Sequence, residues 1–200
     1  MSTQGRFNLS APTRAQLAAV FRDPDALKRA EACFRDVARP RVYGVFTSST
    51  TQAAAAINTA TPITLDAQEL GVVDPASNVG GFCYRDAVNT SRVYITQGGI
   101  YNFQFSLQLD KTTGGVGLCY IWPRINGVDM PNSASRVRIQ GNDAESIPAW
   151  NFVLSIEPGD YFELMFAVDD TSVQIQQFAA TAFCPATPSV ILTVTDNIGP

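Results

Sequence analysis

This 200-residue sequence contains no histidine. Imidazole is the general base of Ser-His-Asp and Cys-His nucleophilic sites and a common zinc ligand, so its absence excludes those catalytic and metal sites. Long apolar runs are also missing, and none approaches the roughly 20 residues that a membrane-spanning helix needs. The sequence therefore predicts a globular, non-enzymatic chain with no catalytic residues and no membrane partner.

Charged residues are scarce, at 16% of the chain, and they are unevenly distributed. Residues 1–42 hold eight basic and four acidic side chains, for a net charge of +4. The other 158 residues hold six basic and fourteen acidic ones, for a net charge of −8. A basic segment on an acidic body is typical of an arm with its own partner, although a solvated helical hairpin gives the same pattern. The overall charge of −4 argues against nucleic-acid binding, and the low charged fraction suggests that part of the surface faces another subunit.

Two helices are predicted within the first 40 residues. Thr13 and Gln16 fit a capping box, and Asp23-Pro24 combines an N-cap with a proline at the first helical position. The second helix is expected to end at Pro40. Both helices are too short to be stable alone, so their apolar stripe must pack on the β-domain, a sister chain or a larger assembly. We predict that residues 1–41 form an attachment arm whose contact residues are Leu17, Phe21, Leu27, Phe34, Arg29 and Arg35.

A membrane-surface helix is the competing interpretation of such a basic amphipathic arm. Acidic residues are interleaved with the basic ones, and no tryptophan is present before residue 122. Surface-bound helices usually have an acid-poor polar face and aromatic residues on the other. The membrane interpretation is therefore weak.

From Val42 onward, apolar and polar residues alternate with a period of two. The pattern is unbroken over 101–109 and recurs at 136–139, 150–156 and 190–195. About ten short strands separated by tight turns predict a mainly β protein, an antiparallel jelly-roll sandwich over 42–200 that follows a short N-terminal helical arm. Further strands are expected at 42–47, 55–65, 80–84, 92–96, 116–125, 161–168 and 173–178.

The segment 161–168 is apolar on both faces, which predicts that both faces are covered. In a two-sheet sandwich only one face meets the opposite sheet. The second cover must come from another chain or from the arm, so this segment predicts an oligomer.

Few residues suggest chemistry. The four cysteines are 50, 36 and 65 residues apart with no Cys-x-x-Cys pair, which argues against zinc and predicts buried, reduced thiols. Asp169-Asp170 and the pair Asp143/Glu145 could bind calcium or serve a glycosidase, but acidic residues in turns are usually turn formers. Trp122 and Trp150 could stack on sugars, yet their alternating strands favour core positions. We expect no cofactor and no metal.

Two segments resemble the jelly rolls of the tumour-necrosis-factor-like family, which includes the globular heads of complement-type collagens. One is the Gly-x-Tyr-x-Phe strand at 99–103, and the other is the strand, Gly-Asp turn and strand at 154–164. The family's last strand carries Phe-x-Gly, whereas this sequence has Pro188-Ser189-Val190. The resemblance implies a homotrimer whose strands present aromatic residues to the threefold axis. The predicted trimer-interface residues are Tyr101, Phe103, Tyr161 and Met165.

The run from Tyr101 to Thr195 also resembles small structural proteins of tailed bacteriophages. The similar segments are 101–106, 125–133 and 188–194, and the arm around Phe21-Arg22-Asp23-Pro24 resembles N-terminal segments of phage virion proteins. This resemblance implies a virion protein assembled in the host cytoplasm. Its partners would be the major capsid protein or other virion proteins.

Two functions fit this resemblance. The first is a trimeric capsid-decorating or cement protein, attached through three arms that multiply a weak contact by avidity. The alternative is a tail-fibre or tail-needle knob that recognises a host receptor with its loops. A fibre needs a long shaft, and the sequence has no sustained heptads and no repeats, which favours decoration.

Overall fold

The computed structural model describes residues 12–37, 42–71 and 83–196. Within these ranges the chain has two helices and sixteen strands. Its contacts separate it into two compact units, the first ending at Arg41 and the second spanning Val42–Ile198. Neither of the two helices combines the length and the apolar character that crossing a bilayer would require.

The first unit contains α1 (Arg14–Val20) and α2 (Pro24–Val37). The backbone N–H of Gln16 donates to Thr13 Oγ1 at 3.3 Å, and the backbone N–H of Thr13 donates to Gln16 Oε1 at 2.8 Å. This capping box begins α1 as predicted. Asp23 Oδ1 accepts from the backbone N–H of Asp25 at 3.2 Å, so the predicted start of α2 is also confirmed. Pro40, the predicted end, lies outside the described residues.

One layer of the second unit is a five-stranded antiparallel sheet, in which side chains point alternately inward and outward. Its central strands pair over long registers, for example from Gly99 opposite Ile156 to Ser106 opposite Ala149. The strands, in spatial order, are β13 (Ala149–Ile156), β7 (Gly99–Leu107), β16 (Val190–Asp196), β1 (Tyr43–Ser48) and β4 (Ala67–Leu70).

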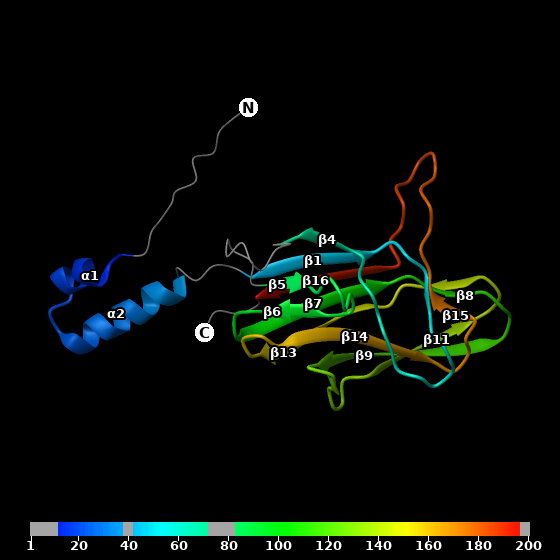
Figure 1. Ribbon diagram of the computed structural model, residues 1–200, viewed down its shortest axis with the longest axis horizontal. Coiled ribbons are helices and arrows are strands. Elements are labelled where there is room, and N and C mark those ends of the chain that lie inside the picture. The colour runs from blue at the N-terminus through cyan, green and yellow to red at the C-terminus, as the bar shows by residue number, and fades with distance from the viewer. Residues whose placement is uncertain (1–11, 38–41, 72–82, 197–200) are drawn as a thin grey trace. The chain divides into compact units, whose positions relative to one another are not determined.

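The opposite layer is a seven-stranded sheet organised around the pairing of β9 with β14. Figure 1 shows β1, β16 and β7 running along β14 and β9. The strands of the seven-stranded sheet, in spatial order, are β10 (Val128–Asp129), β9 (Val116–Ile125), β14 (Tyr161–Val168), β6 (Val93–Ile95) and β5 (Cys83–Arg85). In addition, β11 (Ser135–Gln140) pairs with β9, and β3 (Thr61–Pro62) pairs with β14.

A smaller four-stranded sheet continues the sandwich at the end where Figure 1 shows β8 and β15. The alternating run 101–109, expected as one strand, divides at Gln108 between two sheets. The backbone N–H of Gln108 donates to Ser189 O at 2.9 Å, and its carbonyl accepts from Gln176 N at 2.7 Å. The strands are β12 (Ala144–Ser146), β8 (Leu109–Lys111), β15 (Val173–Ile175) and β2 (Gln52–Ala53).

Aromatic side chains fill the space between the two large sheets. The ring of Phe103 on β7 stacks on that of Phe162 on β14, with centroids 4.2 Å apart. Trp150 on β13 meets Phe105 edge-on at 4.7 Å. Offset and edge-to-face pairs of this kind add to the burial energy of the rings. The core therefore lies between the layers, where the alternating sequence placed it.

The prediction of a strand over 55–65 is wrong for most of that segment. Asn58 adopts a positive φ of 55°, which a strand does not tolerate, and Pro62 lacks the N–H that a central strand must donate. Only Thr61–Pro62 forms the short β3. The segment instead follows the edge of β14, where Asn58 N donates to Val168 O at 2.7 Å and Ile63 N to Leu164 O at 2.8 Å.

Candidate functional site

The outward face of the five-stranded sheet has no charged side chain on β1, β7, β13 or β16, and its edge strand β4 carries Glu69, whose Oε1 accepts from Thr47 Oγ1 at 3.0 Å. Strand pairing places Ile191 beside Ser106, and Val153 beside Asn102, so apolar and neutral polar groups are mixed. The outward residues are Tyr43, Val45, Thr47, Ile100, Asn102, Gln104, Ser106, Ala149, Asn151, Val153, Ser155, Ile191, Thr193 and Thr195. We call this set the neutral face.

Large apolar groups on the neutral face reach solvent: Tyr43, Ile100, Val153 and Ile191 are exposed. Some of its polar groups bond to one another, as where Asn151 Nδ2 donates to Asn102 Oδ1 at 2.7 Å. Burying such a face removes apolar area from water without desolvating a charge. Charge depletion is also the compositional signal of interface cores. The neutral face is therefore suited to contact with another protein surface.

The outward face of the seven-stranded sheet is built differently, from charges and aromatic rings. The guanidinium of Arg92 lies 4.4 Å from the centroid of Tyr161, and Glu163 Oε1 accepts from Ser91 Oγ at 2.8 Å. Arg124 Nε donates to Asp129 Oδ1 at 2.7 Å. The bond from Arg124, followed by one from Trp122, lowers the pKa of Asp129. We call this side of the sandwich the charged face.

The structure corrects three of the four predicted trimer-interface residues. Tyr101, Phe103 and Met165 have 0% exposed surface within the single chain, so their side chains cannot touch a second copy. Tyr101 and Phe103 point into the core because they share the inward side of β7. Tyr161 is half-buried and lies on the charged face beneath Arg92. An interface on the five-stranded sheet would use the alternate residues of β7, such as Ile100 and Asn102.

The argument that β14 needs a second chain for cover is also wrong. Phe162, Leu164 and Phe166 face the core, as expected. On the other side, the chain itself buries Met165, whose register neighbours are Trp122 on β9 and Pro62 on β3. Met165 is therefore buried without help from another subunit. The composition of β14 therefore carries no information about oligomerisation.

The arm buries little of its own apolar stripe. Of the described side chains at 12–34, only Leu17 is buried, Leu27 is half-buried, and Phe21 and Phe34 are exposed. Arg29 is exposed, with Nε donating to Asp25 O at 3.3 Å. The side chain of Arg35 lies outside the described residues. An ion pair of 3.0 Å from Arg14 Nε to Glu31 Oε1 joins the two helices. A pair of helices with one buried side chain has no core of its own.

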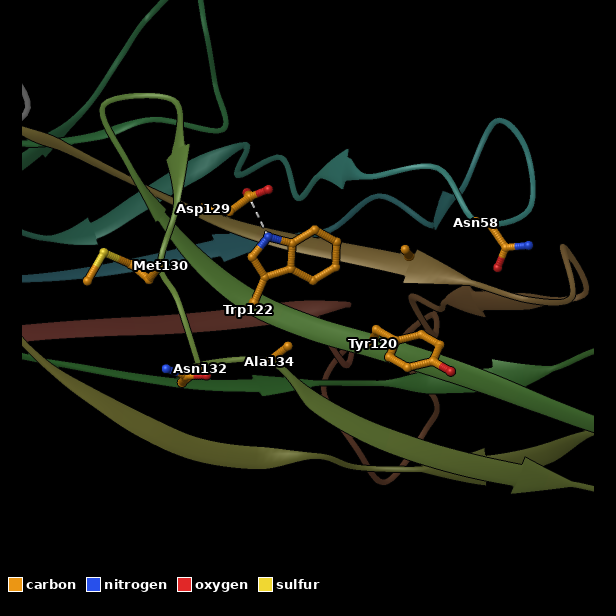
Figure 2. A pocket seen from close by; sticks show the side chains of 8 residues that line it. Asn58, Tyr120, Trp122, Asp129, Met130, Asn132 and Ala134 are labelled. Carbon is orange, nitrogen blue, oxygen red and sulfur yellow. Dashed lines mark hydrogen bonds between the residues drawn. The ribbon is translucent and has the colours of Figure 1, made fainter.

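A pocket on the charged face contains Trp122, which the sequence placed in the core. Trp122 lies on the outward side of β9 together with Tyr120 and Arg124, whereas the prediction placed its side chain on the inward side. Figure 2 shows the indole between Asp129 and Tyr120, with Asn132 and Asn58 on separate segments around it. Trp150, by contrast, is half-buried against Phe105.

A loop at 176–189 projects from the sandwich, visible as the tall orange and red hairpin in Figure 1. Phe178 pairs with Thr187 at its base, and Thr181 N donates to Cys184 O at 2.9 Å near its tip. Phe183 at the tip is 91% exposed. The sequence contained a signal for this loop, because no charged residue occurs between Asp170 and Asp196.

The acidic pair Asp169-Asp170 has a structural role. Asp170 Oδ2 accepts from the ammonium of Lys111 at 2.7 Å, and Ser172 Oγ lies 2.6 Å from the same nitrogen. The Lys111 side chain has 0% exposure, and its hydrogen bond lowers the pKa of Asp170 to about 2. Asp169 Oδ1 accepts from Leu118 N at 2.6 Å. Among the described residues, no group of three metal-ligating side chains is present.

The cysteines fall into two classes, so the prediction of four buried thiols is wrong for two of them. Cys83 and Cys119 are buried, and burial raises the pKa of Cys119 to about 12 and that of Cys83 further still. Such thiols stay protonated and unreactive. Cys33 and Cys184 are exposed and free.

Comparison with known proteins supports the fold. No protein-family model matches the sequence, and a search of curated proteins finds no match. Among solved structures, this chain resembles Eiger TNF from S. frugiperda, with a TM-score of 0.50 and 10% identity over 81% of this chain and 96% of that one. The chain thus has a tumour-necrosis-factor-like jelly roll, and the predicted fold class is confirmed.

Proposed function

We propose that this chain is a non-enzymatic structural protein of a bacteriophage virion, a trimer that decorates the capsid and is attached through its N-terminal arm. The observation that carries the proposal is the neutral face, an uncharged surface of four strands bordered by Glu69 on β4, with exposed Tyr43, Ile100, Val153 and Ile191. The resemblance to phage structural proteins supplies the biological setting.

A second copy of this chain is the occupant that the charge distribution favours. Residues 43–200 carry a net charge of −8, so two bodies repel one another through their charged surfaces. The neutral face has no charge of its own, so copies can approach through it with less repulsion than through their charged surfaces. Because it mixes apolar and neutral polar groups, copies around a threefold axis can each bury it.

The exposed aromatic residues of the arm support the attachment role. Phe21 and Phe34 lie on two helices that bury only Leu17 among the described side chains. The basic charge of residues 1–42 complements an acidic partner surface. Three arms on one trimer raise the effective affinity well above that of a single arm.

A matched pair of substitutions tests the role of the neutral face. Val153 on β13 is 50% exposed on the neutral face, and Val116 on β9 is 44% exposed on the charged face. Val153→Asp should convert the trimer to monomers at micromolar concentration, as measured by light scattering, because each copy would bury an unpaired carboxylate in the interface. Val116→Asp should leave the trimer intact. A wild-type protein that is monomeric, or equal behaviour of the two variants, would refute the neutral-face assembly.

Attachment is tested on particles of the phage that encodes the chain. Deleting residues 1–40 should leave a trimer that no longer binds the particles. If the truncated trimer still binds, the attachment lies in the β-domain. Hundreds of copies per particle, spread over the shell, would support decoration.

A tail-fibre or tail-needle knob is the second candidate, favoured by the projecting loop with Phe183 at its tip. Exposed apolar loop tips are common features of binding surfaces. A few copies per particle, located at the tail vertex, would support this alternative against decoration.

A further inference from the structure

The pocket on the charged face has a volume of about 660 Å³ and is open to solvent. Its lining combines aromatic, amide, carboxylate and small side chains from three separate segments: Asn58, Tyr120, Trp122, Asp129, Met130, Asn132, Ala134 and Ala167. Ala134 and Ala167 leave room that larger side chains would fill. The site lies on the opposite sheet from the neutral face.

Trp122 is held in one orientation. Its indole Nε1 donates to Asp129 Oδ1 at 2.8 Å, and the same oxygen accepts from Arg124 Nε at 2.7 Å. The hydrogen bond uses the only donor of the indole, so the ring offers its apolar face to a ligand. Figure 2 shows that face turned outward, with Tyr120 on the same side of β9. Two aromatic rings two residues apart on a strand form a short, rigid platform.

Polar groups around this platform are available for a ligand. Asn58 and Asn132 both have left-handed backbones, with φ of 55° and 58°, and their side-chain amides make no hydrogen bond with any described residue. Asp129 Oδ2 likewise has no partner among them, since both bonds go to Oδ1. Each amide offers one acceptor and two donors, and the carboxylate offers further acceptor sites.

We propose that this pocket binds a neutral hexose within a glycan, stacked on Trp122. A pyranose ring has an apolar face of C–H groups that matches an indole face and an edge of vicinal hydroxyls that matches planar amides and carboxylates. The lining holds one carboxylate and no cation, which disfavours acidic sugars. This inference goes beyond the proposed structural function and would give either virion location a means of holding glycans.

The test uses the full chain with three neutral probes: maltotriose, mannotriose and triacetylchitotriose. In a Trp150→Phe background, Trp122 is the only tryptophan, and its emission should shift saturably with at least one probe. Calorimetry should show that Trp122→Ala weakens binding by about tenfold or more, as expected for the loss of an aromatic stacking partner. Trp122→Phe, which keeps a ring, should retain most of the affinity, and Asn132→Ala should lose several-fold.

Four results would overturn the proposal. The first is the absence of binding by all three probes, and the second is equal affinity in Trp122→Ala and Trp150→Phe. The third is a change of Trp122 emission with protein concentration in the absence of sugar, which would mean that a second copy fills the pocket. Tighter binding of sialyllactose than of the neutral probes would refute the assignment to neutral sugars.

Discussion

The two outward faces of the sandwich are built by antiparallel strands of similar length, yet they differ in charge and in how their polar groups are satisfied. On the neutral face, the side chains of Asn151 and Asn102 form a hydrogen bond with each other. Val153, Ile100 and Ile191 on the same face are exposed to solvent. On the charged face, Arg124 bonds to Asp129, and Glu163 lies near Arg92. Only the neutral face can be covered without desolvating an ion.

The difference shows that low overall charge is not spread evenly over a protein. The 16% charged fraction reflects the uncharged outward surface of β1, β7, β13 and β16, together with the uncharged run 171–195, rather than a uniformly polar surface. Of the two faces, the neutral one is suited to permanent protein contact. The charged one has the rigid aromatic and amide groups that suit a small polar ligand.

The largest expected effect comes from the core behind the neutral face. Phe103→Ala removes a fully buried ring that stacks on Phe162, and it should lower the free energy of unfolding by about 3–5 kcal/mol. Urea denaturation measures the change. Gln104→Ala, the next residue on the outward side, should cost less than about 0.5 kcal/mol. A Phe103→Ala variant of normal stability that fails to assemble would restore Phe103 as an interface residue.

Removing the carboxylate beside Lys111 should have the next largest effect. Asp170→Ala leaves a fully buried ammonium without its charged partner. The expected loss is about 2–3 kcal/mol, below the value for fully buried pairs because Asp170 is itself partly exposed. Lys111→Met should cost less, because the remaining carboxylate can be solvated. Equal losses in the two variants would contradict this asymmetry.

The same pair predicts a pH dependence. Because the hydrogen bond from Lys111 lowers the pKa of Asp170 to about 2, folding favours its ionised form. The stabilisation is complete well above the usual aspartate pKa of about 3.9 and is lost as the pH falls toward 2. The urea midpoint should therefore fall more steeply with acid in wild type than in Asp170→Asn. Parallel curves for the two proteins would argue against the pair as the cause.

A smaller effect is expected on the charged face. Glu163→Gln removes the charge beneath Arg92 but keeps an acceptor for Ser91 Oγ, so we expect a loss of about 1–2 kcal/mol. Glu145→Gln, at an exposed position on β12, is the matched control and should change little. A Glu163→Gln protein as stable as the control would show that the face does not depend on this carboxylate.

The smallest effect should be that of salt on assembly. Raising the ionic strength from about 0.1 M to about 1 M shortens the Debye length from about 10 Å to about 3 Å. If the interface contains no charges, the dissociation constant of the trimer should change less than about threefold. The change should be a slight tightening, because salt screens the repulsion between the acidic bodies. Sedimentation equilibrium measures this. Strong dissociation by salt would place the interface on charged residues instead.

Sequence patterns predicted the strands well where alternation was long. The runs at 101–109, 150–156 and 190–195 gave β7 with β8, β13 and β16, and the capping box at Thr13 gave the start of α1. The strand predicted over 55–65 was wrong because the backbone preferences of Asn58 and Pro62 outweighed the strand-forming composition of the segment. The same alternation did not indicate which apolar residue of a strand faces the core and which faces a partner. Tyr101 was therefore assigned to an interface, and Trp122 to the core, in error.

By itself, the sequence determined the order of helices and strands, the fold class and the division of charge between arm and body, because these depend on local periodicity and composition. The tertiary structure decided which side of each strand is outward and which distant residues meet. Lys111 donates a hydrogen bond to Asp170, which is 59 positions away in the sequence, and Asn58 lines the same pocket as Trp122. An alternating strand pattern establishes only that successive side chains point to opposite faces of the sheet. The packing of one sheet against the other decides which of these two faces lies in the interior.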